Sequence, residues 1–385
     1  MSIIKVDFAI IGAGSAGLQL AMAMAKDSYF DDKKIVLFDP DPKTKNDRTW
    51  SYWEIGEGEW DNHLVNSWSL ANFFSSDKTL SIPTAPYRYK TLRSIDFYNQ
   101  AKAVLSQKEN ILWIDEEVVK TSEMDGGLGL QTASGSYNSG HCFDSRIDKA
   151  FLNEMDGKIR ILQHFKGRIV RFKKPVFKPE EFTIMDFRIS WENTTSFVYV
   201  LPKNEYEGMI EYTFFTKETV AEKVYDEMLD RYIDAYLSKD SYDILEEEIG
   251  VIPMSNFKFE VLNTNSLTKI GTAGGWVRGS TGYAFKRTGN YVKKIIDNIR
   301  AEDLPSKGLI KKRYGLFDTL LLDILEKRNH IMPEIFADIY ANNPIDRVFR
   351  FLDGETTIWD DFRIMNSVKP WPFLKAIWNQ WIIRN

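Results

Sequence analysis

One acidic residue stands among aromatic and apolar residues in a segment with the composition of a β-strand. Residues 209–216 read MIEYTFFT, and side chains in a strand alternate between its two faces. Glu211 therefore shares a face with Met209 and Phe215. Burial without a partner raises the pKa of a carboxyl group, so a glutamate here can keep its proton at neutral pH and act as a general acid. The alternative is an edge strand on which Glu211 faces water, the usual environment of a glutamate.

A second group of residues has the spacing of a dinucleotide-binding loop. An apolar run over residues 6–11 predicts a buried strand, and Gly12-x-Gly14-x-x-Gly17 follows it directly. The first glycine permits a tight turn, the second lets the backbone approach a pyrophosphate, and the third lets helix and strand pack closely. A predicted helix starts behind the loop, and its N-terminus attracts phosphate. Asp39 ends the next predicted strand, where its carboxylate can bind an adenosine ribose; the alternative is a chance glycine-rich turn.

Two later segments bear on which dinucleotide binds. Residues 271–285 read GTAGGWVRGSTGYAF, and FDSR at 143–146 follows a predicted strand. Together with the N-terminal loop, they resemble the FAD-binding fold shared by glutathione reductase and para-hydroxybenzoate hydroxylase. The resemblance implies FAD rather than NAD, although a flexible loop is the alternative for the later glycine-rich segment. The further cofactor contacts that it implies are Asp144, Gly274, Gly275 and Gly282.

The amino-acid composition disfavours several classes of protein. The chain has 385 residues, of which 43% are hydrophobic and 14% aromatic, enough for two or three domain-sized units. A net charge of −5 disfavours nucleic-acid binding, which needs a basic face. The single cysteine, Cys142, excludes an internal disulfide and favours a reducing compartment. The four histidines are not spaced as metal ligands, so we expect no metal site.

The predicted elements indicate an α/β protein. We expect a Rossmann-like FAD-binding domain, an interleaved substrate domain with a mixed or antiparallel β-sheet, and a helical C-terminal region. Residues 197–202 and 209–216 flank KNEYEG and predict an antiparallel hairpin, whereas the charge run at 246–248 is interpreted as a solvated helix end. The expected ranges are 1–90, 100–170 and 260–300 for the FAD-binding domain, 170–260 for the substrate domain and 301–385 for the helical region.

Four segments, in this order, resemble the bacterial lycopene β-cyclase family of flavin-dependent carotenoid cyclases. They are NDRTWSYW (46–53), IEYTFF (210–215), EEEIGVIPM (246–254) and GGWVRGSTGYAF (274–285). The resemblance spans nearly the whole chain. It implies redox-neutral cyclisation of the linear ends of lycopene to β-rings, giving γ-carotene and β-carotene, with reduced FAD as cofactor and NAD(P)H as its reductant.

The resemblance also implies roles for individual residues. Glu211 matches the carboxylate that is the proposed acid of the family, and Arg48 is implied as a contact of the flavin or its phosphates, with a surface salt bridge as the alternative. Related motifs often carry two adjacent acids, but position 212 is tyrosine here. Either one acid suffices or the Tyr212 phenol relays a proton. Aromatic side chains that could line the pocket or serve only as core are Trp50, Trp53, Tyr283 and Phe285.

Other functions remain open on the same fold. A flavin-dependent monooxygenase or halogenase would take up oxygen, and a prenyl-chain reductase would consume NAD(P)H in proportion to product. A scaffold that binds flavin without catalysis is a further class. The strand end at 271–274 reads GTAG and lacks the aspartate usual in the oxygenases.

Lycopene dissolves in the bilayer, so we expect a cytoplasmic protein that binds the inner face of the membrane peripherally. Residues 8–25 are apolar, but their glycines divide them into a strand and a helix, and we expect neither a signal peptide nor a transmembrane helix. Residues 315–325 are one candidate contact, and the C-terminal helix, which could instead pack on the core, is the other. The C-terminal candidates are Phe373, Leu374, Ile377, Trp378 and Trp381, with Lys375 and Arg384 nearby.

Overall fold

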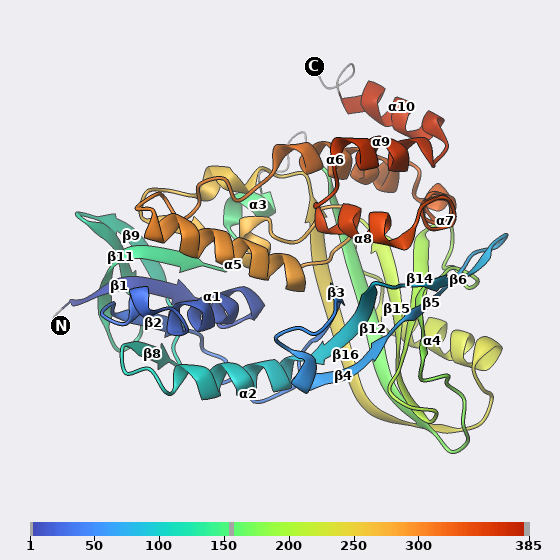
Figure 1. Ribbon diagram of the computed structural model, residues 1–385, viewed down its shortest axis with the longest axis horizontal. Helices are drawn as coiled ribbons and strands as arrows, with labels where there is room; N and C mark the ends of the chain where they lie inside the picture. The colour runs from blue at the N-terminus through green and yellow to red at the C-terminus, as the bar shows by residue number, and fades with distance from the viewer. Residues whose placement is uncertain (1–2, 154–157, 381–385) are drawn as a thin grey trace.

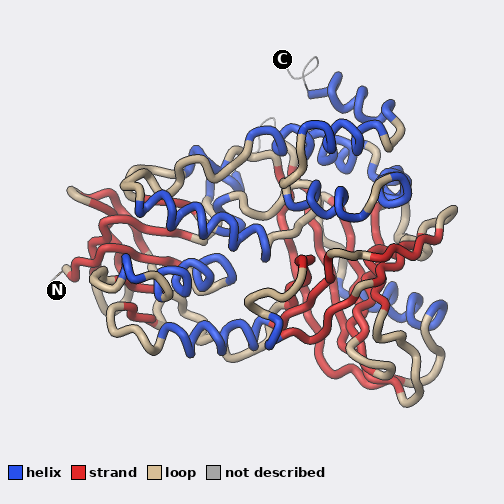
Figure 2. Tube along the Cα trace, in the orientation of Figure 1, coloured by secondary structure: helices blue, strands red, loops and turns tan. Residues whose placement is uncertain are grey.

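The computed structural model describes residues 3–153 and 158–380. Two seven-stranded sheets lie side by side along the long axis of the molecule, and helices cover them (Figure 1, Figure 2). A small three-stranded sheet adds a third group of strands. This mixed α/β architecture confirms the expected fold class.

The first sheet contains the N-terminal strand and the glycine loop. Its order is β8-β2-β1-β11-β10-β9, with β17 also paired to β11. Its strand β2 is a short apolar run that is buried along its whole length, as expected for a parallel strand covered on both faces. The strands are β1 (Ile4–Ile11), β2 (Ile35–Phe38), β8 (Ile111–Ile114), β9 (Lys120–Met124), β10 (Gly127–Gln131), β11 (Ser136–Asp144) and β17 (Leu267–Lys269).

Three helices pack with this sheet into one apolar core (Figure 1). They are α1 (Ser15–Ala25), α2 (Ser94–Leu105) and α5 (Phe285–Arg300). The strand–loop–helix unit predicted at the N-terminus is therefore confirmed. A short helix, α3 (Lys149–Asn153), follows the first sheet.

The second sheet carries the segment with the isolated acid. Its order is β16-β12-β15-β14-β13-β5-β6, and every pair except β13–β5 is antiparallel. The predicted hairpin is confirmed as β14 and β15. The strands are β5 (Leu70–Phe74), β6 (Thr79–Pro83), β12 (Arg160–Phe172), β13 (Glu181–Asp186), β14 (Thr195–Pro202), β15 (Glu207–Thr216) and β16 (Tyr242–Ser255).

The two faces of β15 lie in different environments, as its alternating pattern predicts. Ile210, Tyr212 and Phe214 pack against helix α4 (Glu222–Tyr236) on one face. Met209 and Phe215 belong to the core on the opposite face. Because α4 occupies one side of the strand, Glu211 is directed to the other side.

The small sheet and the C-terminal helices complete the second core. The sheet has the order β3-β7-β4 and consists of β3 (Thr49–Ile55), β7 (Tyr87–Arg93) and β4 (Leu64–Trp68). The helical C-terminal region is also observed (Figure 1). Its helices are α6 (Lys312–Lys327), α7 (Met332–Asn342), α8 (Ile345–Asp353), α9 (Ile358–Asn366) and α10 (Pro370–Trp378).

The observed strand pairing differs from what was expected for residues 246–248 and for the domain ranges. Residues 246–248 lie within β16, so the expected helix end is wrong. The sheets also cut across the expected domain ranges, because β5, β6 and β12 lie in the ranges 1–90 and 100–170 but pair in the second sheet. The division into those ranges stays a prediction. Within the described part of the chain, none of the helices has both the length and the apolar character needed to cross a membrane.

Candidate active site

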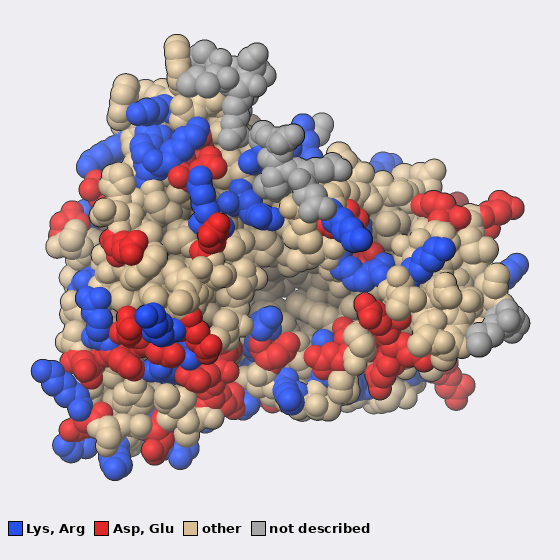
Figure 3. All heavy atoms as spheres, turned by 180° about the vertical axis from the view of Figure 1, so that it is seen from behind, with Lys and Arg blue, Asp and Glu red and all other residues tan. Residues whose placement is uncertain are grey.

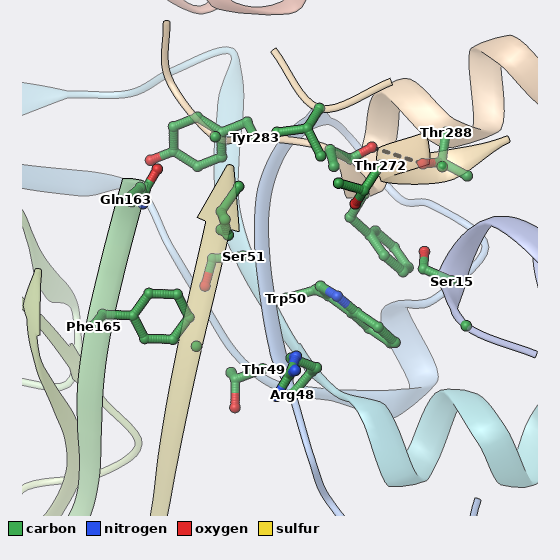
Figure 4. A pocket seen from close by; sticks show the side chains of 18 of the residues that line it. Ser15, Arg48, Thr49, Trp50, Ser51, Gln163, Phe165, Thr272, Tyr283 and Thr288 are labelled. Atoms are coloured by element: carbon green, nitrogen blue, oxygen red, sulfur yellow. Dashed lines mark hydrogen bonds between the residues drawn. The ribbon is translucent and has the colours of Figure 1, made fainter. Parts of the chain in front are cut away.

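A cavity of about 470 Å³ lies where the glycine loop meets the second sheet. Its wall takes residues from the N-terminal loop, from β3, from strands β12, β15 and β16, and from the segment 271–285. The space-filling view from behind is hollowed near the middle of the molecule (Figure 3). In close-up, Ser15 and Thr272 lie on one side of the cavity, and Phe165 and Gln163 lie on the other (Figure 4). The cavity thus joins the two sheets.

The three glycines of the N-terminal loop have different surroundings. A Cβ on Gly17 would lie 1.9 Å from the Gly12 carbonyl oxygen, and one on Gly12, whose φ is +99°, would lie 2.0 Å from Ser145 Oγ. These two positions therefore exclude a side chain. Gly14 lines the cavity and has no atom within 4 Å of its would-be Cβ. Its backbone is thus open to a ligand at the start of α1, where no side chain among the described residues caps the helix.

Asp39 lies beside this loop but is not among the described residues that line the cavity. It accepts hydrogen bonds from the backbone N–H groups of Ala13 at 2.6 Å and Asp41 at 2.8 Å, and Lys43 Nζ lies 3.4 Å away. Arg48 is exposed at the cavity wall and donates to the Asp47 carbonyl at 2.6 Å. Its expected role as a flavin contact stays a prediction.

The three later glycines that were expected to contact the cofactor lie in different places. Gly282, with a φ of +76°, lines the same cavity, and its would-be Cβ lies 2.0 Å from Gln163 Oε1. Gly274 packs against the Lys269 carbonyl, and Gly275 lines a separate cavity of about 630 Å³.

Asp144 is buried at the end of β11 and is engaged within the protein. It accepts hydrogen bonds from Arg146 at 3.0 Å and from Lys269 Nζ at 3.1 Å. Although burial opposes ionisation, these two cations hold the pKa of the Asp144 carboxyl below its usual value. The structure therefore brings Gly14, Arg48, Glu211 and Gly282 together at one cavity, whereas Asp39, Asp144, Gly274 and Gly275 lie outside its wall.

Glu211 is partly buried in the wall that β15 provides. Burial, reinforced by the negative charge of Glu248, raises the pKa of the Glu211 carboxyl to about 8, although a hydrogen bond from Thr213 Oγ1 at 2.8 Å lowers it. Burial therefore favours the protonated form of this carboxyl at neutral pH. It is an acid that faces a cavity, as its position among apolar residues predicts.

Tyr212 lies on the opposite face of the strand. Its hydroxyl donates to the Ile189 carbonyl at 2.9 Å and lies 3.1 Å from Ser196 Oγ. The suggestion that the Tyr212 phenol relays a proton to the site is therefore wrong, because alternation directs this side chain toward α4.

Glu248 is an acid that the sequence interpretation missed. Burial raises the pKa of its carboxyl to about 7, while a hydrogen bond from Thr49 Oγ1 at 2.7 Å and the positive charge of Arg48 lower it. The signal was available in the segment IGVIPM, whose β-branched residues favour a strand. A strand reading would have placed Glu246 and Glu248 on one face and Glu247 on the other.

Aromatic side chains form much of the remaining wall. Tyr89, Tyr199 and Tyr283 line the cavity, and the hydroxyls of Tyr199 and Tyr283 lie 3.3 Å apart. Trp50 also lines it and stacks on Phe285 with ring centroids 5.1 Å apart. Trp53 is instead a core residue, buried against Phe349 and hydrogen-bonded to Asp353 at 2.7 Å.

A comparison with protein families gives a match over most of the chain. Residues 7–377 match the family described as lycopene cyclase protein. The chain belongs to this family. A search of curated proteins found no match.

Solved structures show the fold. A geranylgeranyl bacteriochlorophyll reductase-like protein from Thermoplasma acidophilum is 12% identical, with a TM-score of 0.59 over 99% of this chain and 97% of that chain. A triple mutant of the flavin-dependent brominase Bmp2 is 13% identical, with a TM-score of 0.61 over 95% and 99%. A mutant of halogenase PltM in complex with FAD is 12% identical, with a TM-score of 0.58 over 96% and 87%. This lycopene cyclase family member thus has the architecture of flavin-dependent enzymes.

Two alanine substitutions separate folding from cofactor binding at the glycine loop. Gly17→Ala places a methyl group against the Gly12 carbonyl, and we expect it to lower the free energy of unfolding by about 1–3 kcal/mol or more. Gly14→Ala meets open space, so we expect a change below about 1 kcal/mol. We expect Gly14→Ala to lower the affinity for FAD at least tenfold, because its methyl group would occupy the space proposed for the cofactor. Urea unfolding and flavin titration measure the two effects; native affinity in Gly14→Ala would contradict the assignment.

Proposed function

We propose that this protein cyclises the linear ends of lycopene to β-rings without net oxidation or reduction. The observation that carries the proposal is the position of Glu211, whose pKa burial raises, in an aromatic cavity that also reaches the glycine loop. Protonation of an alkene needs an acid that water does not compete with, and burial provides this environment. Membership of the lycopene cyclase family supports the same substrate class.

FAD is the proposed cofactor, and NAD(P)H is its proposed reductant. The open backbone at Gly14 and the uncapped start of α1 fit the pyrophosphate, as expected for a helix N-terminus. Arg48 and Gly282 lie on the same cavity wall and would contact the flavin. Reduced FAD, when bound, supplies negative charge that stabilises a nearby carbocation.

The reaction needs one proton in and one proton out for each ring. Glu211 donates its proton to C2 of the terminal alkene, which leaves a cation at C1. The C5–C6 double bond then attacks C1, so that a C1–C6 bond forms and the positive charge moves to C5. Loss of a proton from C6 forms the new C5–C6 double bond. Substrate and product are isomers, and no electrons are transferred.

The aromatic wall suits a cationic intermediate. The faces of aromatic rings attract cations, and the tyrosines at positions 89, 199 and 283 line the cavity together with Glu211. Burial raises the pKa of Tyr89 to about 12, so its phenol stays neutral beside the acid. These rings would stabilise the cation without reacting with it.

We also propose that the protein binds the inner face of the membrane through α9 and α10. Helix α10 projects from the body of the molecule (Figure 1). Several large apolar side chains on the two helices are exposed, and four of these are aromatic. Their exposed fractions are 75% for Trp359, 58% for Phe362, 70% for Trp371 and 55% for Trp378. The sequence predicted Leu374, Ile377 and Trp378 of α10 as membrane contacts, but it did not predict the exposed Trp359 and Phe362 of α9. Trp381 and Arg384 lie outside the described residues.

This surface has the composition of an interfacial anchor. Tryptophan is favoured at the level of lipid headgroups, and basic residues beside it bind anionic lipids. Arg363 and Lys375 are exposed on the same two helices. Peripheral contact would let lycopene pass from the bilayer to the cavity, which supports a cytoplasmic location at the membrane.

A lycopene-accumulating bacterium tests the proposed reaction. We expect cells that express the native chain to convert lycopene to β-carotene, and Glu211→Gln to lower conversion by about 100-fold or more, because the general acid is lost. Pigment extraction and chromatography measure both. A matched control is Glu207→Gln, which changes another glutamate of β15, one that binds Arg171 and Lys203 and does not line the cavity.

The other outcomes identify the competing functions. Conversion by both the native chain and Glu211→Gln would retain the reaction and exclude Glu211 as its acid. Unchanged lycopene with soluble, flavin-bound protein would contradict cyclisation. Oxygen uptake would then indicate a monooxygenase or halogenase, and NAD(P)H consumption in proportion to product would indicate a prenyl-chain reductase.

Sedimentation with vesicles of phosphatidylglycerol and phosphatidylcholine tests the membrane surface. We expect Trp359→Ser combined with Trp371→Ser to weaken binding at least tenfold, because each indole would lose about 1.5–3 kcal/mol of apolar burial. Val261→Ser is the control, since Val261 is 70% exposed but belongs to neither α9 nor α10. Equal binding by the double variant and the native protein would contradict this surface.

A further inference from the structure

Four residues of the second sheet form one row across neighbouring strands. Gly167 of β12 lies opposite Glu211 of β15 on one side and Glu248 of β16 on the other. Tyr199 of β14 continues the row beyond Glu211. Residues directly opposite each other in antiparallel strands point to the same face of the sheet. The two glutamates are therefore neighbours on the cavity side, separated only by a glycine.

Gly167 leaves the space between these glutamates open. A Cβ at this position would lie 3.3 Å from Glu248 Cγ, 3.7 Å from Glu211 Cβ and 2.6 Å from Met209 Cε. Any larger residue would thus stand between the two acids. The side chains of Lys166 and Arg168 point to the opposite face, where they bind Asp226. No cation on β12 therefore separates the glutamates, among the residues that the structure describes.

Glu211 and Glu248 have different titratable and charged groups around them. Tyr89 and Tyr199 face Glu211 from β7 and β14. Arg48, Asp47 and Glu246 act on Glu248 from the segment before β3 and from its own strand. Of these, Arg48 favours the ionised form of Glu248, whereas the two acids oppose it.

Thr49 adds a fixed hydrogen bond to Glu248. Glu211 likewise accepts a hydrogen bond from Thr213, so the two carboxyls differ in the charges around them and not in this bond. Such a pair titrates as a coupled unit. Because Arg48 favours the ionised form of Glu248, we expect the first negative charge of the pair on Glu248 and the remaining proton on Glu211.

We propose that Glu248 is a positioning residue that acts on Glu211 across Gly167 and keeps Glu211 in its acid form. The ionised Glu248 makes a second negative charge on the same face unfavourable, so the proton stays on Glu211. This inference rests on the proposed function, because it assigns Glu211 as the acid.

Three variants test the proposal through the pH dependence of cyclisation by purified, flavin-loaded protein. We expect Glu248→Gln to move the alkaline loss of activity to lower pH, because the neutral amide no longer opposes ionisation of Glu211. Glu248→Asp keeps the charge and should leave the profile closer to that of the native protein. Glu247→Gln is the control, since this residue binds Arg168 on the opposite face. A uniform loss of activity with an unchanged profile in Glu248→Gln would overturn the proposal.

A second readout does not depend on cyclisation. Infrared difference spectra of the purified protein follow the protonated carboxyl band that Glu211→Gln removes. We expect the midpoint of this band to fall by at least half a pH unit in Glu248→Gln and to stay unchanged in Glu247→Gln. An unchanged midpoint in Glu248→Gln would overturn the proposal even if lycopene is cyclised. A shifted midpoint without cyclisation would support the coupling and overturn the proposed function alone.

Discussion

Partial burial of the Glu211 carboxyl in the cavity wall is the constraint on which the rest of the site depends. A carboxylic acid in water is ionised at neutral pH, and only burial or a neighbouring negative charge keeps its proton in place. The second sheet provides both conditions. Helix α4 covers the opposite face of β15, so the alternation of the strand directs Glu211 into the cavity. Glu248, two strands away in the same row, adds the charge.

The cavity unites two parts of the fold that have different physical tasks. The first sheet ends in a loop whose glycines allow α1 to approach the strand and leave its N-terminus open for phosphate groups. The second sheet offers a wide, twisted wall on which acids and aromatic rings can be spaced by strand register. Cation chemistry needs both at one place: a charged cofactor and an acid protected from water. The small sheet with Trp50 and Tyr89 lies where the two meet.

Local patterns in the sequence predicted the parts of the site that are formed by contiguous residues. The strand, glycine loop and helix at the N-terminus follow from spacing alone, and so do the two faces of residues 209–216. Glu248 was missed because its role depends on pairing between β16 and β12, which are distant in sequence. Asp144 was implied as a cofactor contact by the resemblance, whereas its ion pair with Lys269, on another strand, could not be predicted from local sequence. The exposed tryptophan of α9 was likewise invisible until the helix packing was known.

The source of the new hydrogen in the product tests the central claim most directly. If Glu211 protonates C2, the new hydrogen comes from a carboxyl whose proton exchanges with solvent. Cyclisation in heavy water must then place one deuterium in each ring. Mass spectrometry and NMR of the β-carotene measure this incorporation. The account predicts one deuterium at C2 of each ring and no added hydrogen pair. A product without deuterium, or one reduced by two hydrogens, would contradict acid-catalysed, redox-neutral cyclisation.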